Sequence, residues 1–108
     1  MNIITNNNAM CSFAIDALHN VEDPEIGLNI IDLGLVYQID FDEESKKIFC
    51  TMTLTTQFCP MGESILNTVK LSLEKFFSDF TAEVYLTFEP SWNSDRISEM
   101  GRIFLNRK

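Results

Sequence analysis

The spacing of the apolar residues changes twice within residues 48–88, and this change restricts the possible folds most. Over residues 48–54 every second residue is apolar, and threonines and Phe49 lie between them, which predicts a β-strand with one apolar face. Over residues 61–79 they recur every three to four positions, which predicts an amphipathic helix. Alternation returns over residues 82–88. Because a strand, a helix and a strand form a right-handed crossover, we expect the two strands to be parallel.

Further elements are predicted on both sides of this unit. A second alternating run over residues 33–41 is joined to the strand at 48–54 by a short polar link, which predicts an antiparallel hairpin. Residues 9–21 have the period of a one-faced helix, and Asn93 or Ser94 is expected to cap a last helix. The order α-β-β-α-β-α predicts a two-layer α+β fold, with a small mixed three-stranded sheet covered by helices on one face.

The domain organisation is expected to be simple. Residues 1–8 are rich in asparagine and show no apolar period, so they are interpreted as an N-terminal tail that ends at a helix cap, Asn7 or Asn8. Residues 9–108 have the length of a single domain.

Within the predicted sheet, one face is apolar and the other carries several threonines. Cys50 alternates in phase with Ile48 and Met52, so we expect it to be a buried and inert thiol. Val36, Phe49 and Tyr85 are expected on the opposite face. That face is the candidate surface for self-association of the chain.

The composition excludes several classes of partner. The formal net charge is −8 and there is no basic run, which argues against binding nucleic acid or an anionic membrane surface. No apolar run approaches the ~18 residues of a membrane span, and residues 1–8 lack the features of a signal peptide. Free cysteines without an export signal favour the cytoplasm.

Three cysteines, Cys11, Cys50 and Cys59, and one histidine, His19, are the soft-metal ligands of the chain. The odd count and the absence of a C-x-x-C pair argue against a disulfide framework or a zinc knuckle. His19 is expected at the surface near a helix C-terminus. A complete four-ligand metal site within one chain is therefore not expected from Cys and His alone.

Cys59 directly precedes Pro60 at the junction of the predicted strand and helix. Proline suits the first helical position, so Cys59 is predicted to be the N-cap. A thiol there would lie near unpaired N–H groups and the positive end of the helix dipole, which favour the thiolate. The alternative is a small polar cap that serine could replace.

Four motifs occur in a specific order over residues 9–105. They are Asp23-Pro24-Glu25, the stretch from Asn29 to Tyr37, the strand Met52-Thr53-Leu54-Thr55 that runs into Cys59-Pro60, and Pro90-Ser91-Trp92. Together they resemble the SufT/PaaD-like family of iron–sulfur cluster assembly proteins. The resemblance implies the α+β fold of that family and a non-enzymatic role in making, carrying or delivering iron–sulfur clusters.

The resemblance also implies site residues. Cys59 matches the cysteine of the family's T-x-x-x-C-P segment, and Asp23 and Glu25 match the acidic pair of its D-P-E motif, which makes these three the candidate ligands of iron or a cluster. Trp92 matches the tryptophan after the late proline. Phe58 departs from the glycine of many relatives, and a bulky side chain there could cover the thiol or offer an apolar docking surface.

A cluster needs more than one thiolate, and the loop offers only Cys59. We therefore expect iron or an iron–sulfur cluster to be held transiently, between two chains of a homodimer or with a partner protein. The expected partners are the assembly machinery and client apoproteins. For Asp23 and Glu25 the alternative is a turn that only orients the chain.

Two other functions stay open from the sequence. The chain could be a non-catalytic adaptor, as the PaaD branch implies beside a phenylacetyl-CoA epoxidation system. It could also be a small thiol enzyme with Cys59 as nucleophile. The enzyme would need an adjacent base, and the only histidine, His19, lies on the first predicted helix.

Overall fold

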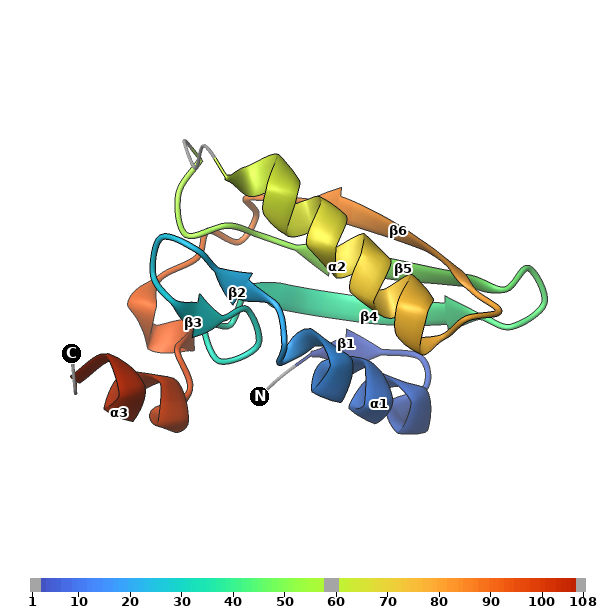
Figure 1. The fold of residues 1–108 in the computed structure, drawn as a ribbon, viewed down its shortest axis with the longest axis horizontal. Helices are drawn as coiled ribbons and strands as arrows, with labels where there is room; N and C mark the ends of the chain where they lie inside the picture. Colours follow the sequence, from blue (N-terminus) through green and yellow to red (C-terminus); the bar gives the residue numbers. More distant parts are fainter. Residues whose placement is uncertain (1–2, 58–60, 107–108) are drawn as a thin grey trace.

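The computed structural model describes residues 3–57 and 61–106 (Figure 1). The two long strands, the central helix and the last strand follow each other as the spacing of apolar residues predicts. The elements, in chain order, are β1 (Ile4–Thr5), α1 (Asn8–Leu18), β2 (Glu22–Asp23), β3 (Leu28–Asn29), β4 (Val36–Asp42), β5 (Lys47–Met52), α2 (Gly62–Phe76), β6 (Thr81–Leu86), the short 3-10 helix η1 (Ser94–Arg96) and α3 (Glu99–Asn106).

The main sheet is mixed, with the strand order β1-β4-β5-β6. β4 and β5 form the predicted antiparallel hairpin, and β6 lies parallel to β5, as the crossover requires. β1 adds a fourth strand, parallel to β4. β2 and β3 form a separate two-stranded antiparallel ribbon. The α+β class is therefore confirmed, while the predicted sheet of three strands is one strand too small.

Two helices cover one face of this sheet. α1 and α2 lie side by side over it, and α3 lies apart, beside the β2–β3 ribbon (Figure 1). The α2 stripe buries Ile65, Val69 and Leu73, whose spacing of four places them on one side of the helix. β5 buries Ile48 and Cys50 against the helices. The fully buried apolar side chains of β4, β5 and both helices thus form one core.

A β-bulge at the start of β4 changes which residues face the core. Val36 pairs with Met52 and Gln38 pairs with Thr51, so Tyr37 is an extra residue on β4. Val36 consequently lies on the same face as Met52 and is buried. The prediction that Val36 shares the open face with Phe49 and Tyr85 is wrong, because strict alternation fails at the bulge.

The N-terminal segment is better ordered than predicted. Ile4–Thr5 pairs with β4, and the Asn6 side chain extends the pairing by donating to the Phe41 carbonyl and accepting from the Phe41 N–H, both at 2.9 Å. The prediction of a tail over residues 1–8 is therefore wrong for Ile4–Thr5. Asn7 caps α1 by accepting from the N–H of Met10 at 3.0 Å, as predicted.

Two helix starts also differ from the predictions. α2 begins at Gly62 with Met61 at the N-cap position, so the prediction of Cys59 as the N-cap of a helix starting at Pro60 is wrong. The last predicted helix is divided: Asn93 caps η1, and α3 begins later, at Glu99. Asn93 accepts from the Asp95 N–H, whereas Met61 makes no side-chain cap bond, so neither helix start follows from residue propensity alone.

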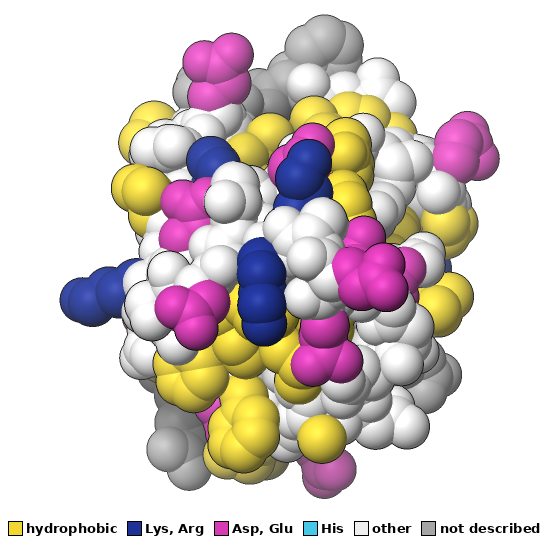
Figure 2. Space-filling model, turned by 90° about the vertical axis from the view of Figure 1, so that its right-hand side faces the viewer, with side chains coloured by type: hydrophobic (Ala, Val, Ile, Leu, Met, Phe, Trp, Pro, Cys, Tyr) yellow, Lys and Arg dark blue, Asp and Glu magenta, His cyan; other side chains and the backbone are white. Residues whose placement is uncertain are grey.

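The distribution of charged side chains on the surface agrees with the absence of a basic run in the sequence. Figure 2 views the molecule from the right-hand side of Figure 1, and there the basic side chains stand singly among acidic ones. No basic patch gathers on this face. Among the residues that the structure describes, none of the helices has the length and apolar character that crossing a membrane requires.

Candidate functional site

The predicted motifs meet at one end of the main sheet. Three backbone hydrogen bonds connect them: Ile30 N–H to the Val21 carbonyl at 2.9 Å, Leu35 N–H to the Ile30 carbonyl at 3.0 Å, and Thr53 N–H to the Leu35 carbonyl at 2.8 Å. This series joins the end of α1, the connection into β4 and the end of β5. The D-P-E turn and the start of the segment that carries Cys59 are thereby held at the same end.

The segment between β5 and α2 has anchored ends. Thr53 and Leu54 are buried. Gly62, the first residue of α2, packs so closely on Leu54 that an added Cβ would lie 2.8 Å from the Leu54 Cδ1. The predicted role of Cys59 as a ligand and that of Phe58 beside it fall on residues 58–60, which lie outside the described residues.

Asp23 forms the D-P-E turn. The residue is 1% exposed, and its Oδ1 accepts from the Glu25 N–H at 2.9 Å. Its carbonyl accepts from the N–H groups of Ile26 and Gly27 at 3.2 and 2.7 Å. Gly27 has φ 79°, a conformation that glycine adopts without strain. These contacts give Asp23 the turn-forming role that the sequence offered as the alternative to a ligand.

Glu25 lies on the outside of this turn with an exposed side chain. Within residues 3–57 and 61–106, no three or more His, Cys, Asp or Glu side chains are grouped so that they could hold a metal ion. The described residues therefore do not form a metal site by themselves. The ligand roles of Asp23 and Glu25 stay predictions.

The two cysteines that the structure describes are poor candidates for chemistry. Cys50 is fully buried, as predicted, and this burial, with a smaller contribution from the nearby Cys11, raises its pKa to about 12. Cys11 is 4% exposed, and burial raises its pKa as well. Both remain neutral thiols near pH 7, and a neutral thiol is a poor nucleophile and metal ligand.

His19 is the C-cap residue of α1, as predicted for a surface position near a helix end. Its Nδ1 lies 3.1 Å from the Ile15 carbonyl oxygen, and its side chain is exposed. This contact accounts for the residue by local capping.

The Pro90-Ser91-Trp92 motif packs against the stretch before β4. The Trp92 Nε1–H donates to the Leu33 carbonyl at 2.6 Å, and the Tyr37 hydroxyl donates to the Pro90 carbonyl at 2.8 Å. The Arg96 guanidinium lies over the Tyr37 ring, 4.5 Å from its centroid. Trp92 therefore packs the Pro90-Ser91-Trp92 motif against the motif that runs from Asn29 to Tyr37.

Two residues within the Asn29 to Tyr37 motif make contacts that the sequence did not predict. Gly34 has φ 75°, and an added Cβ would overlap the Arg96 carbonyl oxygen, so only glycine fits. Asp32 accepts from the Asn29 side chain at 2.6 Å and from the Ser98 hydroxyl at 2.7 Å. Serine before Glu99 is a helix-cap signal that predicts the start of α3, but nothing local predicts that it reaches Asp32.

Comparisons with known proteins agree with this arrangement of motifs. Residues 14–88 match the model of a family described as iron-sulfur cluster assembly protein. The chain is 39% identical over 89 residues to the Fe-S protein maturation auxiliary factor YitW of Bacillus subtilis (strain 168), covering 82% of this chain and 86% of the relative. It is 40% identical over 87 residues to the Fe-S protein maturation auxiliary factor SufT of Staphylococcus aureus (strain USA300), covering 79% and 96%.

A solved structure supports the same assignment. The crystal structure of a DUF59 domain of unknown function from Bacillus anthracis superposes with a TM-score of 0.87 at 34% identity, over 94% of this chain and 95% of that one. Sequence and fold thus agree over nearly the whole length. The chain therefore belongs to the family of iron-sulfur cluster assembly proteins, as its resemblance to the SufT/PaaD-like family implies.

Proposed function

We propose that this protein is a maturation factor that carries or delivers iron or an iron–sulfur cluster to client apoproteins through the thiol of Cys59. Membership of the family supports the general role in iron–sulfur cluster assembly. The observation that carries the finer proposal concerns the other two thiols: Cys11 and Cys50 are buried in the core with raised pKa values. Cys59 is then the remaining thiol available for cargo.

Because only one thiol is available, the chain alone cannot supply all the ligands of a cluster. Iron–sulfur clusters are held by several thiolates, so one chain supplies only part of the ligand set. The cargo is therefore shared with a second copy or with the client itself, and the client's own cysteines displace the carrier. A ligand set completed in this way favours transient binding and release over stable storage.

The D-P-E turn offers the carboxylates that could complete the set. Asp23 and Glu25 are candidate ligands beside Cys59, and the hydrogen bonds that tie the turn to the end of β5 support their common location. Glu25 has the exposed side chain of the pair, whereas the Asp23 carboxylate accepts from the Glu25 N–H. Direct ligation is therefore assigned to Glu25 first, and Asp23 is proposed to contribute chiefly by holding the turn.

Anaerobic reconstitution with ferrous iron and sulfide tests the proposal. Wild-type protein is expected to develop a charge-transfer absorption band, and Cys59→Ser is expected to lose it because serine keeps a small polar group but removes the soft ligand. Cys11→Ala is the matched control, since it removes a buried thiol and should retain the band. No band in wild-type protein would favour the non-catalytic adaptor, and an equal band in Cys59→Ser would exclude Cys59 as ligand.

A further inference from the structure

β6 is the outer strand of the main sheet on the side of α2 (Figure 1). The N–H groups of Thr81 and Thr87 both donate to the β5 side, to the carbonyls of Lys46 and Met52 at 2.9 Å. Because successive peptide groups of a strand point to opposite sides, Ala82, Val84 and Leu86 direct their N–H and C=O groups away from the sheet. These three residues therefore form the outer edge of the sheet.

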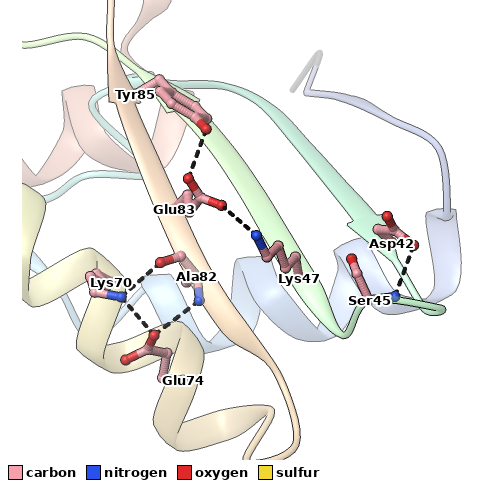
Figure 3. Close-up of polar contacts among 8 residues, drawn as sticks. All are labelled: Asp42, Ser45, Lys47, Lys70, Glu74, Ala82, Glu83 and Tyr85. Carbon is pink, nitrogen blue, oxygen red and sulfur yellow. Dashed lines mark hydrogen bonds and ion pairs between the residues drawn. The ribbon is translucent and has the colours of Figure 1, made fainter.

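The first of these outward positions is blocked by side chains of α2. The Ala82 N–H donates to the Glu74 carboxylate at 3.0 Å, and the Lys70 ammonium donates to the Ala82 carbonyl at 2.8 Å (Figure 3). Lys70 and Glu74 are also paired with each other at 2.7 Å. Within residues 3–57 and 61–106, the structure gives no comparable partner to the outward peptide groups of Val84 and Leu86.

The side chains at this open part of the edge are apolar and held in place. Tyr85 is 49% exposed and Leu86 is 42% exposed. The Tyr85 ring stacks on Phe49 at 6.4 Å, and its hydroxyl donates to Glu83 at 3.0 Å, while Glu83 pairs with Lys47 (Figure 3). An edge strand with free peptide groups and ordered apolar side chains is a template for strand addition.

We propose that a second copy of this chain occupies this edge, with β6 antiparallel to the β6 of its partner and the two-fold axis at Tyr85. In this register Val84 of one copy is opposite Leu86 of the other, and each such pair exchanges both of its backbone hydrogen bonds. The same residues serve on both sides, so the edge is self-complementary, as a two-fold interface requires.

The charges along β6 and the bonding of Ala82 to α2 favour a second copy as the occupant of the edge. Residues 84–88 contain no charged side chain, although the chain carries a net charge of −8 that would make most other faces repel each other. Glu83 would lie opposite Thr87, so no like charges face each other across the pair. Ala82, already bonded to α2, would lie opposite Phe88, and the pairing therefore ends there on both sides.

The side chains complete this interface on both faces of the sheet. Val84 and Leu86 lie on the helix-covered face, since they pair with Cys50 and Met52 of β5, and each would cover the other across the new pair. Tyr85 lies on the open face and would meet Tyr85 of the second copy beside Phe49. The proposed dimer does not depend on the binding of iron or a cluster.

Backbone amide hydrogen exchange on the full chain tests the register, combined with sedimentation equilibrium over a range of protein concentrations. The amides of Val84 and Leu86 are expected to become protected as the dimer forms, whereas the Ala82 amide, bonded to Glu74, should be protected at every concentration. A chain that sediments as a monomer throughout, or a dimer in which these two amides exchange freely, would overturn the proposal.

Tyr85→Lys places like charges across the two-fold axis and is expected to abolish the dimer. Leu71→Lys is the matched control, because Leu71 is 55% exposed on α2 and is not a residue of β6. It should leave the dimer intact, and circular dichroism checks that both variants fold. A dimer that survives Tyr85→Lys, or protection of Val84 and Leu86 that appears only when another protein is added, would contradict a second copy at this edge.

Discussion

Ser98 binds Asp32 with both its main chain and its side chain: its N–H donates to the Asp32 carbonyl and its hydroxyl donates to the Asp32 carboxylate, each at 2.7 Å. The hydroxyl also accepts from the Gly101 N–H at 3.0 Å, which caps the first turn of α3. Residues separated by more than half of the chain are thus joined. This contact fixes α3 to the stretch that leads into β4.

Asp32→Ala is expected to lower the free energy of unfolding by about 2 kcal/mol, because it removes hydrogen bonds to a charged group and leaves the Ser98 and Asn29 donors without this acceptor. Urea denaturation measures the effect. Asp16→Ala, at an exposed position of α1, is the matched control and should change stability by less than about 0.5 kcal/mol. Equal effects at the two positions would show that the Asp32 contacts contribute no stability.

Gly34→Ala is expected to be more damaging than Gly27→Ala. Both glycines have positive φ, 75° and 79°, so each substitution meets a left-handed backbone cost of about 1 kcal/mol. At Gly34 the new Cβ also overlaps the Arg96 carbonyl oxygen, so the total loss should reach about 3 kcal/mol or more. Thermal or urea unfolding of the two variants tests the difference. Equal losses in the free energy of unfolding would mean that the backbone around Arg96 moves away from the new Cβ at little cost.

Glu74 gives stability a dependence on pH. The hydrogen bond from Lys70, followed by that from the Ala82 N–H, lowers the pKa of the Glu74 carboxyl. A carboxyl with a lowered folded pKa stabilises the protein at pH values above its unfolded pKa, and the contribution disappears as the pH falls through the folded value. Stability should therefore decrease below about pH 4.3, the usual glutamate pKa.

Denaturation curves of wild type and Glu74→Gln, recorded from pH 7 to pH 3, check this dependence. The variant should lose less stability over the acid range than the wild type, because it has no carboxyl to protonate at this position. Glu43→Gln, in the exposed turn between β4 and β5, is the matched control and should follow the wild type. If Glu74→Gln does so too, the Lys70–Glu74 pair has no role in the acid response.

Thiol reactivity separates the three cysteines. At pH 8 the native protein is expected to react quickly at one thiol, because Cys11 and Cys50 are buried and have raised pKa values. Cys59→Ser should remove that fast reaction, and denaturant should expose the remaining thiols in both proteins. A colorimetric disulfide reagent follows the time course, and a fast phase that persists in Cys59→Ser would place the reactive thiol in the core.

The sequence predicts the central part of the fold because its apolar spacing is regular. The hairpin of β4 and β5, the crossover through α2 and the burial of Cys50 all follow from periods of two and about 3.6 residues. Val36 is the exception, since the bulge at Tyr37 shifts the alternation by one residue. The side chain of this extra residue contacts Pro90 and Arg96, which lie far away in the sequence, so the local pattern gives no sign of the bulge.

The missed contacts share a physical cause. Asn6 pairs with Phe41 through its side-chain amide, which takes the place of a strand residue in a segment without apolar period. Ser98 and Asp32 likewise meet through side-chain hydrogen bonds over a long sequence separation. Of the candidate site, the sequence predicted the turn at Asp23-Pro24-Glu25, whereas the bonding of Asp23 within that turn required the structure. The role of Cys59 stays a prediction.

The most direct test of the account is the transfer of cargo to a client. Wild-type protein is loaded anaerobically with iron and sulfide, desalted and mixed with an apo-ferredoxin, and the cluster acquired by the ferredoxin is measured after the two are separated. We predict transfer from the wild type and from Cys11→Ala, and none above the protein-free background from Cys59→Ser. Equal transfer from the wild type and Cys59→Ser would contradict delivery through this thiol.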